Sequence, residues 1–176
     1  MFWHRACPRA ANRVTFPRTM EIFVDADACP VKDETYVVST RHGLAVVLVA
    51  NSSMNVPSGF GAELVVVDQG PDVADDWIVE NVRPGDIVVT ADIPLAARCL
   101  EVGARAIGTN GRIFTEDGIG VLVATRDLKT ELRDAGMMTS GPPPLSDRDR
   151  SRFLAKLEEL VQLSLRAEKE HQASQP

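Results

Sequence analysis

Short β-branched runs alternate with segments of helical pattern along most of this 176-residue chain. Ala45–Ala50 (AVVLVA) is the clearest run, because its six side chains are all apolar, as in a strand covered on both faces of a parallel sheet. Pro30 stands where a first helical turn would begin, and Gly43 stands where that helix would end. This alternation predicts an α/β fold, a three-layer single domain with a mostly parallel sheet.

The same pattern locates the individual elements. Five strands are expected, at Ile22–Val24, Ala45–Ala50, Leu64–Val67, Ile87–Thr90 and Arg105–Ile107. Helices are expected between and after them, at Pro30–Arg41, Pro71–Val82, Pro94–Val102, Thr115–Ala135 and from Ser146 onward.

The last helix carries two further signals. Ser146 and Asp149 have the spacing of a capping box at its start. An apolar stripe follows, which predicts packing onto the core, with a dimer seam as the alternative: Phe153, Leu157, Leu160 and Val161. A homodimer therefore stays open at this point.

Charge is unevenly distributed along the chain. Residues 1–19 contain four arginines and no acid, which leaves −10 for the remainder of a chain whose net charge is −6. A body this acidic repels nucleic acid on average, so such a partner would need a bridging cation or a local basic rim. We expect residues 1–19 to be a disordered extension upstream of Met20, with a transit-like peptide as the alternative. The domain should span 20–165, and 166–176 should be a frayed tail.

Three cysteines and no C-x-x-C pair argue against a disulfide framework and a zinc ribbon, and they indicate a reducing, cytoplasmic location. No apolar run approaches about 18 residues, so no membrane partner is expected. The chain also lacks a phosphate-binding P-loop and a G-x-S-x-G motif. Cys29 could be a nucleophile, but a small buried residue is the favoured interpretation.

Acidic residues gather where predicted strands end. Asp25 and Asp27 end the first strand, and Asp92 follows the fourth. Ligands of parallel α/β sheets bind beyond the carboxyl ends of the strands, near the switch in strand order. The helix after the third strand begins at the same edge and opens with three more acids, Asp72, Asp75 and Asp76.

Converging carboxylates cost free energy unless a cation neutralises them, and their hard oxygen atoms favour Mg²⁺ or Mn²⁺. Such an ion can activate water and stabilise charge on a phosphoryl oxygen. The alternative is structural. Asp27 could cap the helix that starts near Pro30, and Asp72 and Asp75 could interact favourably with a helix dipole.

Five motifs in the same order closely resemble the YaiI/YqxD family of bacterial proteins, over about Met20–Leu165. They are VDADACP (24–30), LVAN (48–51), DVAD (72–75), TADIPLA (90–96) and LSDRDR (145–150). That family in turn resembles the PIN-like superfamily. The resemblance implies a parallel sheet flanked by helices and a Mg²⁺- or Mn²⁺-dependent ribonuclease with clustered acids.

Carried over by motif, the resemblance implies that Asp25 is the first-strand acid, Asp75 the helix acid and Asp92 the fourth-strand acid. These three would hold the metal. Asp27 is an extra acid that belongs to the DADACP motif, and Asn110 stands nearest the position of a fourth acid.

The leading hypothesis is therefore a metal-dependent phosphodiesterase that acts on RNA, with Asp27 orienting the attacking water. Candidate substrate-binding residues are Asn51, Ser52, Thr90, Arg126 and Arg148. Further candidates for a basic rim are Lys129, Arg150 and Arg152. Two alternatives remain. One is a haloacid dehalogenase-type phosphatase that uses the D-x-D of residues 25–27, Ser52 and Asp92. The other is a catalytically idle protein that binds a metal or ligand.

Overall fold

A computed structural model describes residues 19–27, 29–134 and 144–174. Within these residues, six strands form one sheet in the order β3-β2-β1-β4-β5-β6. The strands are β1 (Glu21–Asp25), β2 (Ala45–Ala50), β3 (Ala62–Val66), β4 (Ile87–Val89), β5 (Arg105–Ile107) and β6 (Ile113–Phe114). The first five pair in parallel and β6 is antiparallel to β5, which confirms the predicted mostly parallel sheet.

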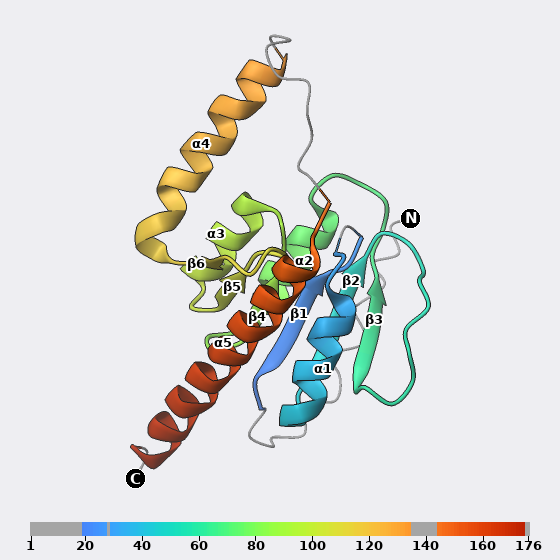
Figure 1. The fold of residues 1–176 in the computed structure, drawn as a ribbon, viewed down its shortest axis with the longest axis vertical. Coiled ribbons are helices and arrows are strands. Elements are labelled where there is room, and N and C mark those ends of the chain that lie inside the picture. The colour runs from blue at the N-terminus through green and yellow to red at the C-terminus, as the bar shows by residue number, and fades with distance from the viewer. Residues whose placement is uncertain (1–18, 28, 135–143, 175–176) are drawn as a thin grey trace, which may run out of the picture.

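Helices cover both faces of the sheet (Figure 1). They are α1 (Lys32–His42), α2 (Val73–Asn81), α3 (Ile93–Glu101), α4 (Glu116–Asp134) and α5 (Asp147–Ala173). Alternate side chains of β1 point to opposite faces, so Ile22 packs in one core with α1 and α5, whereas Phe23 packs in the other with α2 and α3. The expected three-layer α/β architecture is thereby confirmed.

Helix α4 lies at the edge of this arrangement and runs away from the sheet (Figure 1). Its first turns pack through Ile119 and Leu122 against a small core that includes Ala96 of α3 and Phe114 of β6. The prediction ended this helix at Ala135, which lies outside the described residues.

The start of α1 differs from the prediction. The helix begins at Lys32, and its N-cap is Val31, which makes no side-chain capping bond. The idea that Asp27 caps this helix is therefore wrong, because its carboxylate binds a backbone N–H at the end of β2 instead. The C-terminal end is as expected. Gly43 adopts a left-handed conformation with φ of 65°, where its N–H bonds the carbonyls of the last turn.

Helix α5 confirms the predicted capping box of Ser146 and Asp149. Its apolar stripe is fully buried within this single chain, which confirms core packing: Phe153, Leu157, Leu160 and Val161. The helix extends to Ala173, through most of the 166–176 segment that the sequence predicted to be frayed. These C-terminal turns are mostly exposed, and they form one wall of a cavity.

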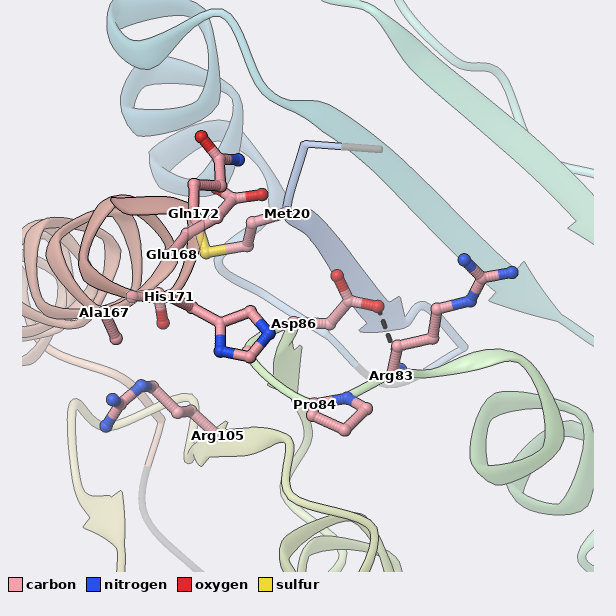
Figure 2. A pocket seen from close by; sticks show the side chains of 11 residues that line it. Met20, Arg83, Pro84, Asp86, Arg105, Ala167, Glu168, His171 and Gln172 are labelled. Carbon is pink, nitrogen blue, oxygen red and sulfur yellow. Dashed lines mark hydrogen bonds between the residues drawn. The ribbon is translucent and has the colours of Figure 1, made fainter. Parts of the chain in front are cut away.

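That cavity, of about 430 Å³, lies at the amino ends of β1, β4 and β5. Figure 2 shows α5, with Ala167 and His171, on one side of it and the loop with Arg83 and Asp86 on the other. Asp86 is buried and accepts hydrogen bonds from the backbone N–H groups of Glu21 (2.9 Å) and Arg83 (3.0 Å). This acid therefore fastens the loop before β4 to the start of β1.

The expected extension at 1–19 falls almost wholly outside the described residues. Among the helices that the structure describes, none has the length and apolar character needed to cross a bilayer.

Candidate active site

The strand order reverses at the centre of the sheet, where β1 lies between β2 and β4. Chain connections leave the carboxyl ends of β1 and β4 in opposite directions, and this divergence opens a crevice between them. Asp25 ends β1, and Thr90 directly follows β4. The predicted acids therefore stand at the switch point of the sheet.

Thr90 joins the two sides of this crevice. Its hydroxyl donates to Asp25 Oδ2 at 3.0 Å and accepts from the backbone N–H of Asp92 at 2.9 Å. A threonine hydroxyl can do both at once, because it carries one proton and two lone pairs. Thr90 is fully buried. It therefore positions the acids, and a role in direct substrate contact, which the sequence suggested, stays a prediction.

Asp92 is held by two groups. It is the N-cap of α3, where Oδ1 accepts the backbone N–H of Leu95 at 3.0 Å. Its Oδ2 pairs with Arg126 Nη2 of α4 at 3.1 Å, and the two side chains are 32% and 44% exposed. Of the predicted basic residues, Arg126 thus reaches the acids directly.

Asp75 completes the group from the first turn of α2. Its pKa is raised to about 6, first by burial and then by the charges of Asp92 and Asp25, while Arg98 acts in the opposite direction. Burial also raises the pKa of Asp25; the Thr90 hydrogen bond opposes this, and the charges of Asp27 and Asp92 add to it. The charge of Asp92 therefore contributes to the raised pKa of both Asp25 and Asp75, which places the three predicted metal ligands close together.

Asp27 lies on the β2 side of the crevice. Its Oδ2 accepts the backbone N–H of Asn51 at 2.8 Å. The Asn51 side chain donates in turn to the carbonyl of Asp68 at 2.8 Å. Asn51 therefore braces the loop after β3, and Ser52 beside it is exposed.

Two of the other predicted basic residues, Arg150 and Arg152, pair away from the acids. Arg150 donates to the carbonyl of Pro30 at 2.8 Å and pairs with Glu34 of α1 at 2.9 Å. Arg152 pairs with Asp149 on its own helix at 3.4 Å, and Arg148 is exposed. The side chain of Lys129 is outside the described residues.

Sequence reasoning missed Lys32. Its Nζ donates to the carbonyl of Ala26 at 2.9 Å, and its charge lowers the pKa of Asp25. Its position in the first turn after the DADACP motif was the available signal, because that turn begins at the carboxyl edge. Cys29 is buried, and burial raises the pKa of its thiol to about 11, which argues against a nucleophile.

The donor atoms suit a hard divalent cation in kind, since they are carboxylate oxygens without histidine or thiolate. Across 19–27, 29–134 and 144–174, however, no group of three or more His, Cys, Asp or Glu side chains stands ready to hold a metal ion. Asp92 is instead paired with the guanidinium of Arg126. A cation at this edge would compete with that guanidinium for the Oδ2 atom.

The fold and the site together define a class, that of open α/β proteins with an acidic site at the switch point of a parallel sheet. Within it, the chain belongs to the YaiI/YqxD family. Residues 23–163 match the family model described as "Uncharacterized BCR, YaiI/YqxD family". The family resemblance drawn from the five motifs is confirmed, and its PIN-like extension stays a prediction.

Curated relatives cover most of the chain. A "UPF0178 protein" of Parvibaculum lavamentivorans is 59% identical over 143 residues, which are 81% of this chain and 93% of the relative. A "UPF0178 protein" of Caulobacter vibrioides is 52% identical over 146 residues, or 83% of this chain and 95% of the relative. No solved structure matches the chain.

Proposed function

We propose that this protein is a metal-dependent phosphodiesterase of PIN-like type that cleaves RNA. The observation that carries the proposal is the placement of Asp25, Asp75 and Asp92, from β1, α2 and the end of β4, at one edge of the sheet, where Thr90 joins Asp25 to Asp92 and burial together with the charge of Asp92 raises the pKa of the other two carboxyls. Burying like charges together is costly for a structural purpose, whereas it suits a site that receives a cation.

In the proposed site Asp25, Asp75 and Asp92 would hold Mg²⁺ or Mn²⁺. When bound, the ion would supply stabilisation of the negative charge that develops on the phosphoryl oxygens. Thr90 would keep Asp25 and Asp92 in place through its two hydrogen bonds. Arg126 would be displaced from Asp92 toward the phosphate of the substrate.

Asp27 is proposed to orient the attacking water. Its Oδ2 is engaged by Asn51, its side chain is exposed, and Oδ1 has no protein donor among the described residues. The water oxygen would bond to phosphorus, the bond from phosphorus to one ribose oxygen would break, Asp27 would accept the water proton, and solvent would protonate the departing oxygen. Asn51, Ser52 and Arg148 remain predicted substrate contacts.

The test is cleavage of an end-labelled single-stranded RNA in Mg²⁺ and in Mn²⁺. We expect Asp25→Asn and Asp92→Asn each to lose at least about 100-fold in rate, the scale for removing one charge-stabilising group. The matched control is Asp76→Asn, because Asp76 is 59% exposed and pairs outward with Arg98. Equal rates for Asp25→Asn and the wild type would contradict the proposal.

The position of Lys32 beside Asp25 favours a haloacid dehalogenase-type phosphatase as the second candidate. In that reaction an oxygen of Asp25 would bond to phosphorus as the ester P–O bond of a phosphomonoester breaks, and solvent would protonate the departing alcohol oxygen. Water would then hydrolyse the aspartyl phosphate, and a cation beside Asp25 would stabilise the charge on the transferred group. A fluoroberyllate adduct trapped on Asp25 in Mg²⁺ would support this candidate. Metal binding without turnover of either substrate would instead indicate the catalytically idle protein.

A further inference from the structure

A cavity of about 860 Å³ opens beside the acids at the same edge of the sheet. Ala91 and Ile93, which flank Asp92 in the chain, line it, and so does Pro30 from the loop after β1. Its volume lies within the roughly 300–1,000 Å³ of small-ligand sites. The cavity therefore lies next to the chain segment that carries Asp92, at the edge of the sheet where the proposed catalytic acids stand.

The lining divides into an apolar part and a polar part. Ile93, Phe114 and Leu122 contribute apolar surface from α3, β6 and α4. Asn110 and Arg112 contribute amide and guanidinium groups from the loop between β5 and β6. An apolar wall beside a cation suits a ligand with a flat, weakly polar portion next to an anionic one.

The loop that carries Arg112 is held rigidly. The backbone N–H of Gly108 donates to the carbonyl of Arg112 at 2.8 Å, and the N–H of Arg112 donates to Asn110 Oδ1 at 3.0 Å. Gly111 lies so close to α5 that a Cβ there would be 2.9 Å from the backbone nitrogen of Phe153. The Arg112 side chain is exposed, and no salt bridge joins it to another described residue.

The opposite wall is also fixed. Arg150 joins the start of α5 to Pro30 and Glu34 at 2.8 and 2.9 Å. Asp149 is the acidic member of the described lining, and its Oδ2 already accepts from the Ser146 hydroxyl at 2.6 Å. Its charge is thus partly satisfied within the capping box, which leaves Arg112 to attract an anion.

We propose that this cavity binds the base of the nucleotide next to the cleaved phosphodiester, with Arg112 on that nucleotide's phosphate. The proposal rests on the proposed function and adds a base requirement to it. A base can enter such a cavity only when it is unpaired and unstacked, so the site selects single strands with bases over a bare sugar–phosphate chain. Ile93, Leu122 and Arg112 become specificity-determining residues.

The test is binding without turnover, followed through the methyl NMR signals of Ile93 and Leu122 in EDTA. The probes are a single-stranded hexaribonucleotide and the same backbone without bases. We expect the hexanucleotide to shift both methyl signals and to bind at least about fivefold more tightly than the abasic chain, the scale of one stacked base. Equal affinity for the two probes would overturn the proposal.

Two variants with matched controls sharpen the result. Leu122→Trp fills the cavity and should abolish the preference for bases, whereas Leu128→Trp on the exposed side of α4 should keep it. Arg112→Gln should weaken the binding of both probes equally and should lower the salt dependence of that binding by about one charge. Arg166→Gln, on the exposed surface of α5, should change neither the affinity nor its salt dependence. Retained base preference in Leu122→Trp would contradict the assignment.

The cleavage assay keeps this inference separate from the proposed function. Base-dependent binding at Ile93 and Leu122 without any turnover in Mg²⁺ or Mn²⁺ would support the cavity and contradict the nuclease. Turnover together with equal binding of the two probes would support the nuclease and contradict the cavity.

Discussion

At the residue scale, Thr90 connects the local hydrogen bonding to the electrostatics of the site. It is buried, donates to Asp25 and accepts from the backbone of Asp92. We expect Thr90→Val, which keeps the shape but removes the hydroxyl, to cost about 1–3 kcal/mol of unfolding free energy, because both partners lose a buried hydrogen bond. Urea denaturation measures this, and Thr90→Ser should recover most of it. An unchanged unfolding free energy in Thr90→Val would show that the hydroxyl does not hold the acids in place.

Asp75 gives the site a pH signature. Its pKa in the folded protein is about 6, above the ordinary 3.8, so the neutral carboxyl favours folding. This contribution is complete below about pH 4 and is lost as the pH rises through about 6. We expect Asp75→Asn to be more stable than the wild type by about 1 kcal/mol at pH 7.5, after allowance for solvent screening of a half-buried group, and equal to it at pH 4.

Thermal unfolding without divalent metal, across this pH range, measures the effect. The control is Asp76→Asn, which removes an exposed pair with Arg98 and should give no gain. A pH-independent gain in Asp75→Asn would mean that ionisation of the Asp75 carboxyl is not its cause.

At the scale of elements, the β5–β6 loop and α5 depend on a close backbone contact at Gly111. This residue has φ of 80°, and a Cβ would be 2.9 Å from Phe153 N. We expect Gly111→Ala to destabilise the protein by at least about 2 kcal/mol in thermal or urea unfolding, because strain at positive φ adds to a clash with helix backbone.

Gly59 supplies the matched control for that prediction. Its φ is 98°, but no atom lies within 4 Å of a Cβ placed there. Gly59→Ala should therefore cost only about 1 kcal/mol, the strain alone. Equal losses in the two variants would show that the loop yields and that its contact with α5 is not tight.

The elements themselves were largely predictable from the sequence. Ala45–Ala50 and Arg105–Ile107 are strands with the expected bounds, because an apolar run between turn residues has few alternatives. Strand β6 was not predicted, because two residues are too few to show an alternation of apolar and polar side chains. Its pairing with β5 also depends on the loop between the two strands. The continuation of α5 to Ala173 was not predicted, because the polar residues after 165 show no apolar period from which a helix could be inferred.

At the scale of the whole molecule, the candidate site was predictable only in part. Asp25 and Asp92 stand at or after the ends of strands, and the carboxyl ends of parallel strands meet at one edge of the sheet. Their position at one edge could therefore be predicted without knowledge of the strand order. The partners Arg126 and Lys32 were harder to assign. Arg126 reaches Asp92 from a helix that follows β6, and nothing in its local sequence specifies that crossing.

The arrangement also separates two ends of the molecule. Carboxylates and the 860 Å³ cavity occupy the carboxyl edge of the sheet, whereas the cavity of Figure 2 lies at the amino edge, where Asp86 serves a structural purpose. Residues 20–176 carry a net charge of −10, so a polyanion at the carboxyl edge needs basic side chains such as Arg112, or a bound cation, to offset the repulsion, and its proposed cleavage needs the divalent ion. The central question for this site is therefore whether the acids hold a divalent ion.

Anomalous diffraction from a crystal soaked in Mn²⁺ tests that claim most directly. We expect a manganese peak in contact with carboxylate oxygens of Asp25 and Asp92, with Arg126 released from Asp92. The peak should be absent from Asp25→Asn crystals. Coordination by Asp75 would complete the assignment. A crystal without a peak at this edge, in which Arg126 still pairs with Asp92 as at 3.1 Å here, would contradict the metal-dependent mechanism.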